Sequence, residues 1–196
     1  MRIVLPSGTP AEIDQSAVNP SMGLVIIPDI FGLRPLFEEM VARFAQEWNM
    51  AVIAFEPFPG RTFSDDVAER FAAMSQLDDD ACMGGMYCHK AAQHERFARI
   101  ASFYGMIHVP SDWAGPKQAE PISCLKAGNA DRVLAIIGSQ DPYTPPTQVN
   151  ELRDAGVTVV EYEEAAHGFA HDPSRPAHRA EDAADAFSRT HRWLLS

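Results

Sequence analysis

The feature that most constrains the fold is the alternation of short apolar segments with longer amphipathic ones. Five segments are short and mostly apolar, and each is followed by glycine, proline or acidic residues that end regular structure: residues 23–27, 50–55, 100–104, 132–137 and 157–162. Segments of this kind are typical of the buried strands of a parallel sheet. We therefore expect these five to be strands.

The stretches between these segments have the periodicity of helices. Leu36, Met40, Phe44 and Trp48 recur at every fourth position and place one apolar face on a helix over residues 36–48. We expect further helices over residues 64–77 and 180–195. Strands that alternate with helices predict an α/β fold with one mostly parallel sheet flanked by helices. A length of 196 residues suits a single domain over residues 1–196.

Charge and cysteine content restrict the partners and the location. The chain has 16 Lys+Arg against 27 Asp+Glu, a net charge of -11. Such a surface repels nucleic acid and anionic membranes, so we expect neither as a partner. No apolar segment approaches the ~20 residues of a membrane span, and the segment after Met1 lacks a secretory signal pattern. Three cysteines without a CxxC pair favour a reducing compartment, and we expect a cytoplasmic protein.

A thiol, a carboxylate and an imidazole occur along the chain in the order Cys82, Asp141, His167. Asp141 and His167 each follow an expected strand, and ligands of open α/β sheets bind at the carboxyl ends of strands. The order nucleophile, acid, histidine is that of α/β-hydrolases. In that arrangement the imidazole takes the thiol proton, and the carboxylate holds the imidazole in the correct tautomer. Gly84 and Gly85 leave backbone N–H groups open to an oxyanion, and a helix N-terminus lowers the pKa of a thiol.

Each of these residues also has a plain structural interpretation. Cys82 can be an inert small apolar residue, and we expect Cys88 to serve packing. Asp141 before Pro142 is a common turn residue, and a loop histidine is as often exposed as catalytic. The spacing of His167 and His171 can suggest a metal pair, but Gly168 and Pro173 disfavour a helix there. We expect no metal and no other cofactor.

Six short motifs, spread in order over nearly the whole chain, point to one family. They are GLVIIPDIFG (23–32), AFEPFPG (54–60), ACMGG (81–85), SFYG (102–105), GSQDPYTPP (138–146) and AHGFA (166–170). With them the chain resembles the dienelactone hydrolase family, cysteine-nucleophile members of the α/β-hydrolase fold. The resemblance implies hydrolysis of a small ester or lactone by a monomer or homodimer.

The resemblance also implies roles for individual residues. Cys82 would be the nucleophile, Asp141 the acid and His167 the base, and the backbone N–H groups of Ile30 and Met83 would form the oxyanion hole. Three further positions correspond to substrate-binding positions of the family: Asp29 stands where the family usually has a glutamate beside the thiol, Arg61 lies within one residue of a family arginine, and His171 replaces a second arginine.

The sequence departs from the family pattern before the nucleophile. A nucleophile elbow needs a buried strand and the pattern Gly-x-Cys-x-Gly, but Asp78, Asp79 and Asp80 precede Ala81 and Cys82. Three buried carboxylates would cost several kcal/mol each, so this segment predicts a fold that lacks one central strand. Two functions follow as alternatives: an ester, lactone or thioester hydrolase with impaired activity, or an inactive remnant that acts as a binding protein. A thiol redox protein is disfavoured because no CxxC pair is present.

Overall fold

The computed structural model describes residues 1–61, 66, 69–70, 84–115 and 118–196. The chain divides into two compact units, Met1–Met83 and Gly84–Ser196. The single domain expected over residues 1–196 stays a prediction. Within the described residues, no helix combines the length and the apolar character needed to cross a membrane.

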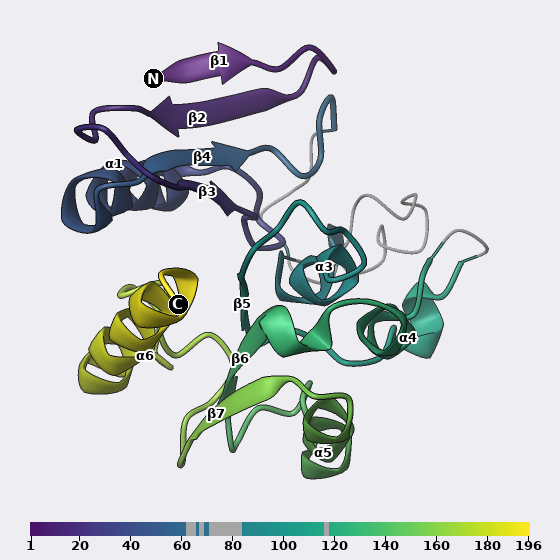
Figure 1. The fold of residues 1–196 in the computed structure, drawn as a ribbon. Helices are drawn as coiled ribbons and strands as arrows, with labels where there is room; N and C mark the ends of the chain where they lie inside the picture. The colour runs from purple at the N-terminus through teal and green to yellow at the C-terminus, as the bar shows by residue number, and fades with distance from the viewer. Residues whose placement is uncertain (62–65, 67–68, 71–83, 116–117) are drawn as a thin grey trace. The chain divides into compact units, whose positions relative to one another are not determined.

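The first unit contains a mixed sheet of four strands in the order β1-β2-β4-β3, seen in purple and blue in Figure 1. The elements are β1 (Arg2–Val4), β2 (Pro10–Asp14), β3 (Gly23–Ile26), α1 (Pro35–Trp48) and β4 (Ala51–Phe55). β1 pairs with β2, and β2 with β4, in antiparallel fashion, whereas β3 pairs with β4 in parallel. α1 packs on β2 and β4 through the apolar face that the sequence predicts, which buries Met40 and Phe44.

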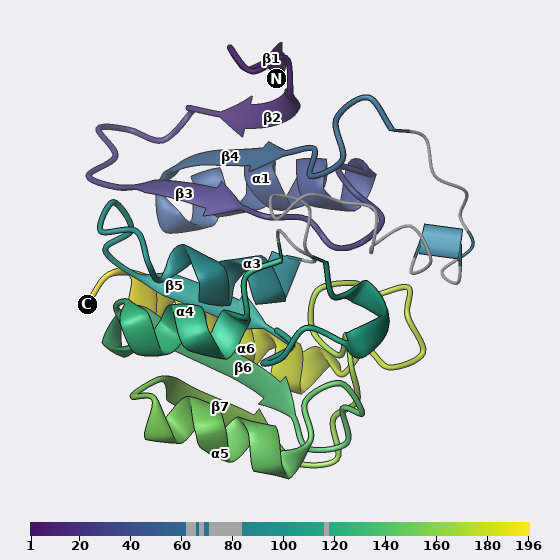
Figure 2. The ribbon, with the colours of Figure 1, turned by 90° about the vertical axis from the view of Figure 1, so that its right-hand side faces the viewer.

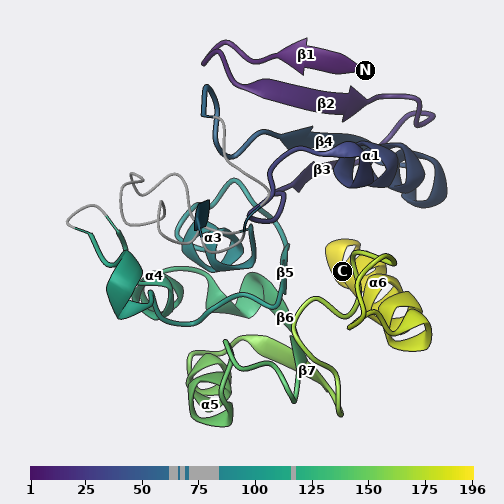
Figure 3. The same cartoon turned by 180° about the vertical axis from the view of Figure 1, so that it is seen from behind.

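The second unit contains a parallel sheet of three strands in the order β5-β6-β7. Its strands are β5 (Ile100–Phe103), β6 (Val133–Gly138) and β7 (Thr158–Tyr162). Its helices are α3 (Gly84–Ala91), α4 (Pro121–Ala127), α5 (Pro146–Asp154) and α6 (Ala180–Leu194). Short 3-10 helices lie at Ser111–Trp113 and Ala130–Arg132. α3, α4 and α5 lie on one face of the sheet and α6 on the other, as Figures 2 and 3 show from two sides.

β6 is the centre of this unit, because all six of its residues are buried. Val133, Ala135 and Ile137 join the apolar cluster with α3, α4 and α5. Leu134 and Ile136 join the cluster with α6. Neighbouring side chains of a strand point to opposite faces, so helices on both faces require an uninterrupted apolar sequence such as VLAII.

All five expected strands and the helices over residues 36–48 and 180–195 are present, with ends that differ by one residue. The helix expected over residues 64–77 falls largely outside the described residues. The expected parallel strands flanked by helices are present, but the described strands form two sheets where one was expected, and the first is mixed because β1 and β2 add antiparallel strands.

The division into two sheets has a reason in the sequence. Among the described residues β3 pairs only with β4 and β5 only with β6, so each sheet ends at one of these strands. Between β4 and α3 the chain contains no β-branched apolar segment that could pair with both. The burial expected for residues 23–27 is wrong as well, since Val25 is 46% exposed.

Candidate active site

The loops that follow β6 and β7 are joined by backbone hydrogen bonds. Ser139 N–H donates to the Tyr162 carbonyl, and Gln140 N–H donates to the Ala165 carbonyl, each at 2.9 Å. Gly138 allows this approach, because a Cβ atom there would overlap the backbone of Ala165. The pairing of two parallel strands therefore brings the residues after them, Asp141 and His167, to the same edge of the sheet.

Asp141 and His167 form a hydrogen-bonded pair. His167 Nδ1 lies 2.8 Å from Asp141 Oδ2, and the contact that the sequence predicts between them is present. The second oxygen, Oδ1, accepts the Tyr143 N–H at 2.9 Å. The Asp141 side chain is fully buried, whereas that of His167 is 31% exposed. A buried carboxylate needs N–H donors, so it assigns the proton to Nδ1 and leaves Nε2 as the basic nitrogen.

Two aromatic rings contact the His167 imidazole. The ring of Tyr104, the residue after β5, lies 5.3 Å from it, centroid to centroid. The ring of Tyr143 approaches edge-on at 5.0 Å. These contacts limit the rotation of the imidazole and leave it packed on Tyr104 and Tyr143 while Asp141 binds Nδ1. The motif SFYG contains Tyr104, but sequence reasoning assigned this residue no role.

The first turn of α3 packs directly on the end of β5. A Cβ atom at Gly85 would overlap the Phe103 carbonyl oxygen and Gly105, so only glycine allows this approach. Ser102 Oγ donates to the Gly85 carbonyl oxygen at 2.8 Å. α3 begins at Gly84, two positions after Cys82 in the sequence. Cys82 and Met83, the expected nucleophile and oxyanion-hole residue, lie outside the described residues.

In the first unit, the expected oxyanion-hole residue Ile30 lies in the loop after β3. Arg70 Nη1 donates to the Ile30 carbonyl at 2.8 Å, and Arg70 is buried. Asp29 accepts the Phe31 N–H at 2.9 Å and forms an ion pair with Arg34 at 2.9 Å. The Asp29 carboxylate is thus held within its own loop.

Glu56, directly after β4, is a further support of this loop that sequence reasoning missed. Its Oε2 accepts the Leu33 N–H and its Oε1 the Phe58 N–H, each at 2.9 Å. A carboxylate that accepts two backbone N–H groups fixes both segments relative to β4. The available signal was an acidic residue placed at the end of an apolar strand, inside the motif AFEPFPG.

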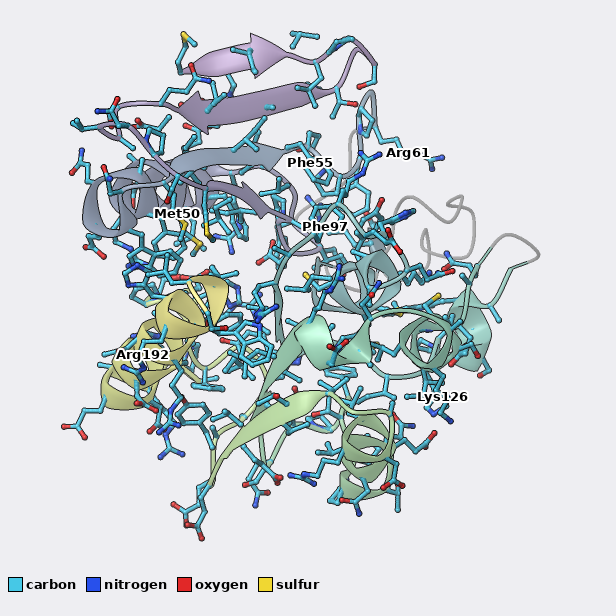
Figure 4. The ribbon with its side chains drawn as sticks, viewed as in Figure 1. Met50, Phe55, Arg61, Phe97, Lys126 and Arg192 are labelled. Carbon is cyan, nitrogen blue, oxygen red and sulfur yellow. The ribbon has the colours of Figure 1, made fainter. Side chains whose placement is uncertain are left out.

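The two remaining substrate-binding candidates differ in their surroundings. Arg61 is exposed, and Figure 4 shows its side chain extending away from the sheet of the first unit. His171 belongs to the second unit and is half-buried, with its ring 5.6 Å from that of Tyr104. The structure thus groups Asp141, His167 and His171 around Tyr104, whereas Asp29, Ile30 and Arg61 belong to the first unit.

The two described cysteines have the environment of packing residues. Cys88 lies against the apolar cluster of the second unit, and burial raises the pKa of its thiol to about 12. Cys124 is buried in α4. The raised pKa of Cys88 is the opposite of what an activated nucleophile needs.

Comparison with solved structures identifies the fold as that of α/β-hydrolases. A candidate dienelactone hydrolase from Klebsiella pneumoniae subsp. pneumoniae superposes with a TM-score of 0.88 at 21% identity, over 100% of this chain and 98% of that one. The dienelactone hydrolase-like promiscuous phosphotriesterase P91, from metagenomic libraries, gives 0.70 at 18% identity, over 100% and 96%. A thermophilic esterase of Thermogutta terrifontis gives 0.62 at 12%, over 100% and 93%.

The sequence itself assigns the family. No curated protein matches the chain, but the model of the dienelactone hydrolase family matches residues 80–196. The chain therefore belongs to the dienelactone hydrolase family and is a carboxylic ester hydrolase. The resemblance drawn from the six motifs is confirmed.

Proposed function

We propose that the protein hydrolyses small esters, lactones or thioesters through a Cys82-His167-Asp141 triad and an acyl-cysteine intermediate. The observation that carries the proposal is the buried Asp141 carboxylate 2.8 Å from His167 Nδ1. This contact orients the imidazole with a basic Nε2 and stabilises the imidazolium that forms when Nε2 accepts a proton. It is the arrangement that a nucleophile needs for its activation.

The proposed reaction has two halves. His167 Nε2 takes the proton of the Cys82 thiol, Sγ attacks the ester carbonyl carbon, and the backbone N–H groups of Ile30 and Met83 stabilise the oxyanion. Collapse breaks the bond to the leaving alcohol, which receives the proton from His167. A water molecule then loses a proton to Nε2 and attacks the acyl-cysteine. The thiol regains its proton, and the net reaction is ester plus water to acid plus alcohol.

Two features of the described residues support Cys82 as the nucleophile. The close approach of Gly85 and Gly105 seats the beginning of α3 on the end of β5, next to Tyr104, which contacts His167. The thiol two positions before α3 is therefore the natural candidate in the sequence. The other two cysteines have packing environments, and the pKa of Cys88 is raised.

The substrate side of the proposal assigns Asp29, Arg61 and His171. Arg61 is exposed and carries a positive charge suited to an acidic substrate, and His171 lies in the loop that carries His167. Asp29 is already paired with Arg34, so its contribution would be to the shape of the loop. The Thermogutta terrifontis esterase was solved with propionate bound, which makes short acyl esters the first substrates to assay.

The test is hydrolysis of p-nitrophenyl acetate by the intact chain and by Cys82→Ala, with Cys88→Ala as the matched control. We expect turnover in the intact chain and in Cys88→Ala, its loss in Cys82→Ala, and an acetyl group on the Cys82 peptide in mass spectra of acid-quenched enzyme. Unchanged turnover in Cys82→Ala would exclude Cys82 as the nucleophile.

An inactive remnant that binds small molecules is the second candidate. It is favoured by the pairing of β3 and β5 on one side only among the described residues, as a missing central strand requires. In that case the intact chain gives no turnover but binds short carboxylates such as propionate in calorimetry. The cytoplasmic location, the monomer or homodimer and the absence of nucleic-acid binding stay predictions.

A further inference from the structure

Tyr104 has an unusual backbone conformation next to the Asp141–His167 pair. Its φ is +54°, in the left-handed region that bulky residues rarely adopt. Tyr104 directly follows β5, and its N–H donates to the Ile136 carbonyl of β6 at 2.9 Å. Such strained residues persist where surrounding contacts hold them, and they cluster at functional sites.

The hydroxyl of Tyr104 is one such contact. It accepts the Ala170 N–H at 2.6 Å, and it is buried. Burial raises the pKa of the phenol, and the N–H groups of Ala170 and His171 oppose that rise. The phenol is therefore neutral, and it ties the end of β5 to the backbone three residues after His167.

The ring of Tyr104 contacts side chains of the same loop. Its centroid lies 5.3 Å from His167, 5.4 Å from Phe169 and 5.6 Å from His171. Asp141 holds only the imidazole of His167, whereas Tyr104 contacts both the imidazole and the backbone that follows it. A loop anchored at two places allows the imidazole less displacement than the hydrogen bond to Asp141 does alone.

We propose that Tyr104 is the positioning residue for His167: its hydroxyl anchors the backbone of the 167–171 loop and its ring supports the imidazole. The role rests on the proposed function, since it presumes that His167 is the base. Tyr104 acts through His167 and carries out no bond-making itself. The left-handed backbone conformation of Tyr104 places its side chain against the 167–171 loop.

Tyr162 provides a matched control in the same unit. Its side chain is also a mostly buried tyrosine, and its ring lies 5.0 Å from Phe169. Its hydroxyl, however, donates to Asp185 on α6 at 2.8 Å. Replacement of either tyrosine by phenylalanine removes one hydroxyl and keeps the ring, but only one replacement releases the Ala170 N–H.

The first measurement is kcat and KM for p-nitrophenyl acetate in the intact chain, Tyr104→Phe and Tyr162→Phe. We expect Tyr104→Phe to lower kcat about tenfold with KM changed less than about twofold, because the imidazole loses position and not substrate affinity. Tyr162→Phe should leave kcat and KM unchanged.

The second measurement needs no turnover. NMR follows the linewidths of the His167 ring protons and the hydrogen exchange of the Ala170 amide in the same three proteins. We expect exchange about tenfold faster in Tyr104→Phe and broader His167 ring signals, with neither change in Tyr162→Phe. Identical linewidths and exchange in Tyr104→Phe and the intact chain would overturn the positioning role. If the intact chain has no turnover while Tyr104→Phe changes both signals, the proposed function fails and the anchoring by Tyr104 stands.

Discussion

The two units differ in the chemical groups that they hold and in how they hold them. All seven histidines lie within residues 84–196, and residues 1–83 contain none. In the second unit Asp141 and His167 meet because they follow paired parallel strands. In the first unit the loop with Ile30 is held by side chains far along the chain, Glu56 and Arg70.

The difference teaches that proton transfer and oxyanion binding have separate structural requirements. Imidazole is the side chain that titrates near neutral pH, so the second unit must supply the acid–base chemistry of the proposed reaction. A backbone N–H donor needs no special residue, but its loop must be held rigidly. The buried Arg70 and the half-buried Glu56 supply that rigidity in the first unit.

The largest effect is expected where the second unit is changed at its buried carboxylate. Asp141→Asn removes the acceptor that selects the His167 tautomer, so kcat for p-nitrophenyl acetate should fall about 10³-fold or more. The exposed Asp154→Asn in α5 is the control and should keep full activity. A fall of less than tenfold in a folded Asp141→Asn would show that the pair takes no part in catalysis.

The second largest effect is expected in the first unit, at the loop after β3 that contains Ile30. Glu56→Ala leaves the N–H groups of Leu33 and Phe58 without their acceptor, and should lower kcat about 10²-fold and the free energy of unfolding by about 1–3 kcal/mol. Glu47→Ala, at an exposed position of α1, is the matched control. Equal activity of the two variants, measured beside urea unfolding, contradicts the role of this loop.

Acid should act on the second unit through His89. Burial lowers the pKa of this side chain in α3 to about 4. Between about pH 6.5 and pH 4 the unfolded chain binds a proton there that the folded chain does not, so the free energy of unfolding falls as the pH falls, by up to about 3 kcal/mol.

The variant His89→Leu checks this contribution by urea unfolding at pH 7 and pH 4.5. It should be less stable than the intact chain at pH 7, since the Met106 carbonyl loses a partner, but it should lose less stability on acidification. His94→Leu, at an exposed position, is the control and should follow the intact chain. The same pH dependence in His89→Leu and the intact chain rules His89 out as the source.

The smallest effect concerns an ion cluster of the second unit. His108 Nδ1 lies 2.7 Å from Glu120, and Nε2 lies 3.1 Å from Glu151, with all three side chains over one third exposed. Because exposed pairs contribute little, His108→Gln should lower the free energy of unfolding by about 0.5–1 kcal/mol at pH 6. The difference in the free energy of unfolding between the two proteins should shrink in 1 M NaCl, where the Debye length is about one third of that in physiological salt. An equal difference at both salt concentrations would mean that packing, not charge, is lost.

The sequence by itself determined the positions of the five strands and of the candidate residues Asp141 and His167. A β-branched run closed by turn residues is a local signal, and residues after neighbouring parallel strands meet at one edge of a sheet. The sequence does not reveal the strands β1 and β2, because Arg2–Val4 is too short to show a period and Pro10–Asp14 begins with proline and has a single β-branched residue. The pairing of β1 with β2 and of β2 with β4 identifies them.

Only the tertiary structure decided which side chains support the site. Arg70 contacts the Ile30 carbonyl 40 positions away, and the Tyr104 hydroxyl binds the Ala170 N–H 66 positions away. Such contacts produce no periodicity or fixed spacing in the sequence that would predict them. An arginine or a tyrosine can bond with many groups of the chain, and the sequence does not identify which one it contacts. The pairing of β1 and β2 into the sheet of the first unit was decided in the same way. Strand pairing depends on which segments the rest of the chain brings together, whereas the tendency to be a strand is local.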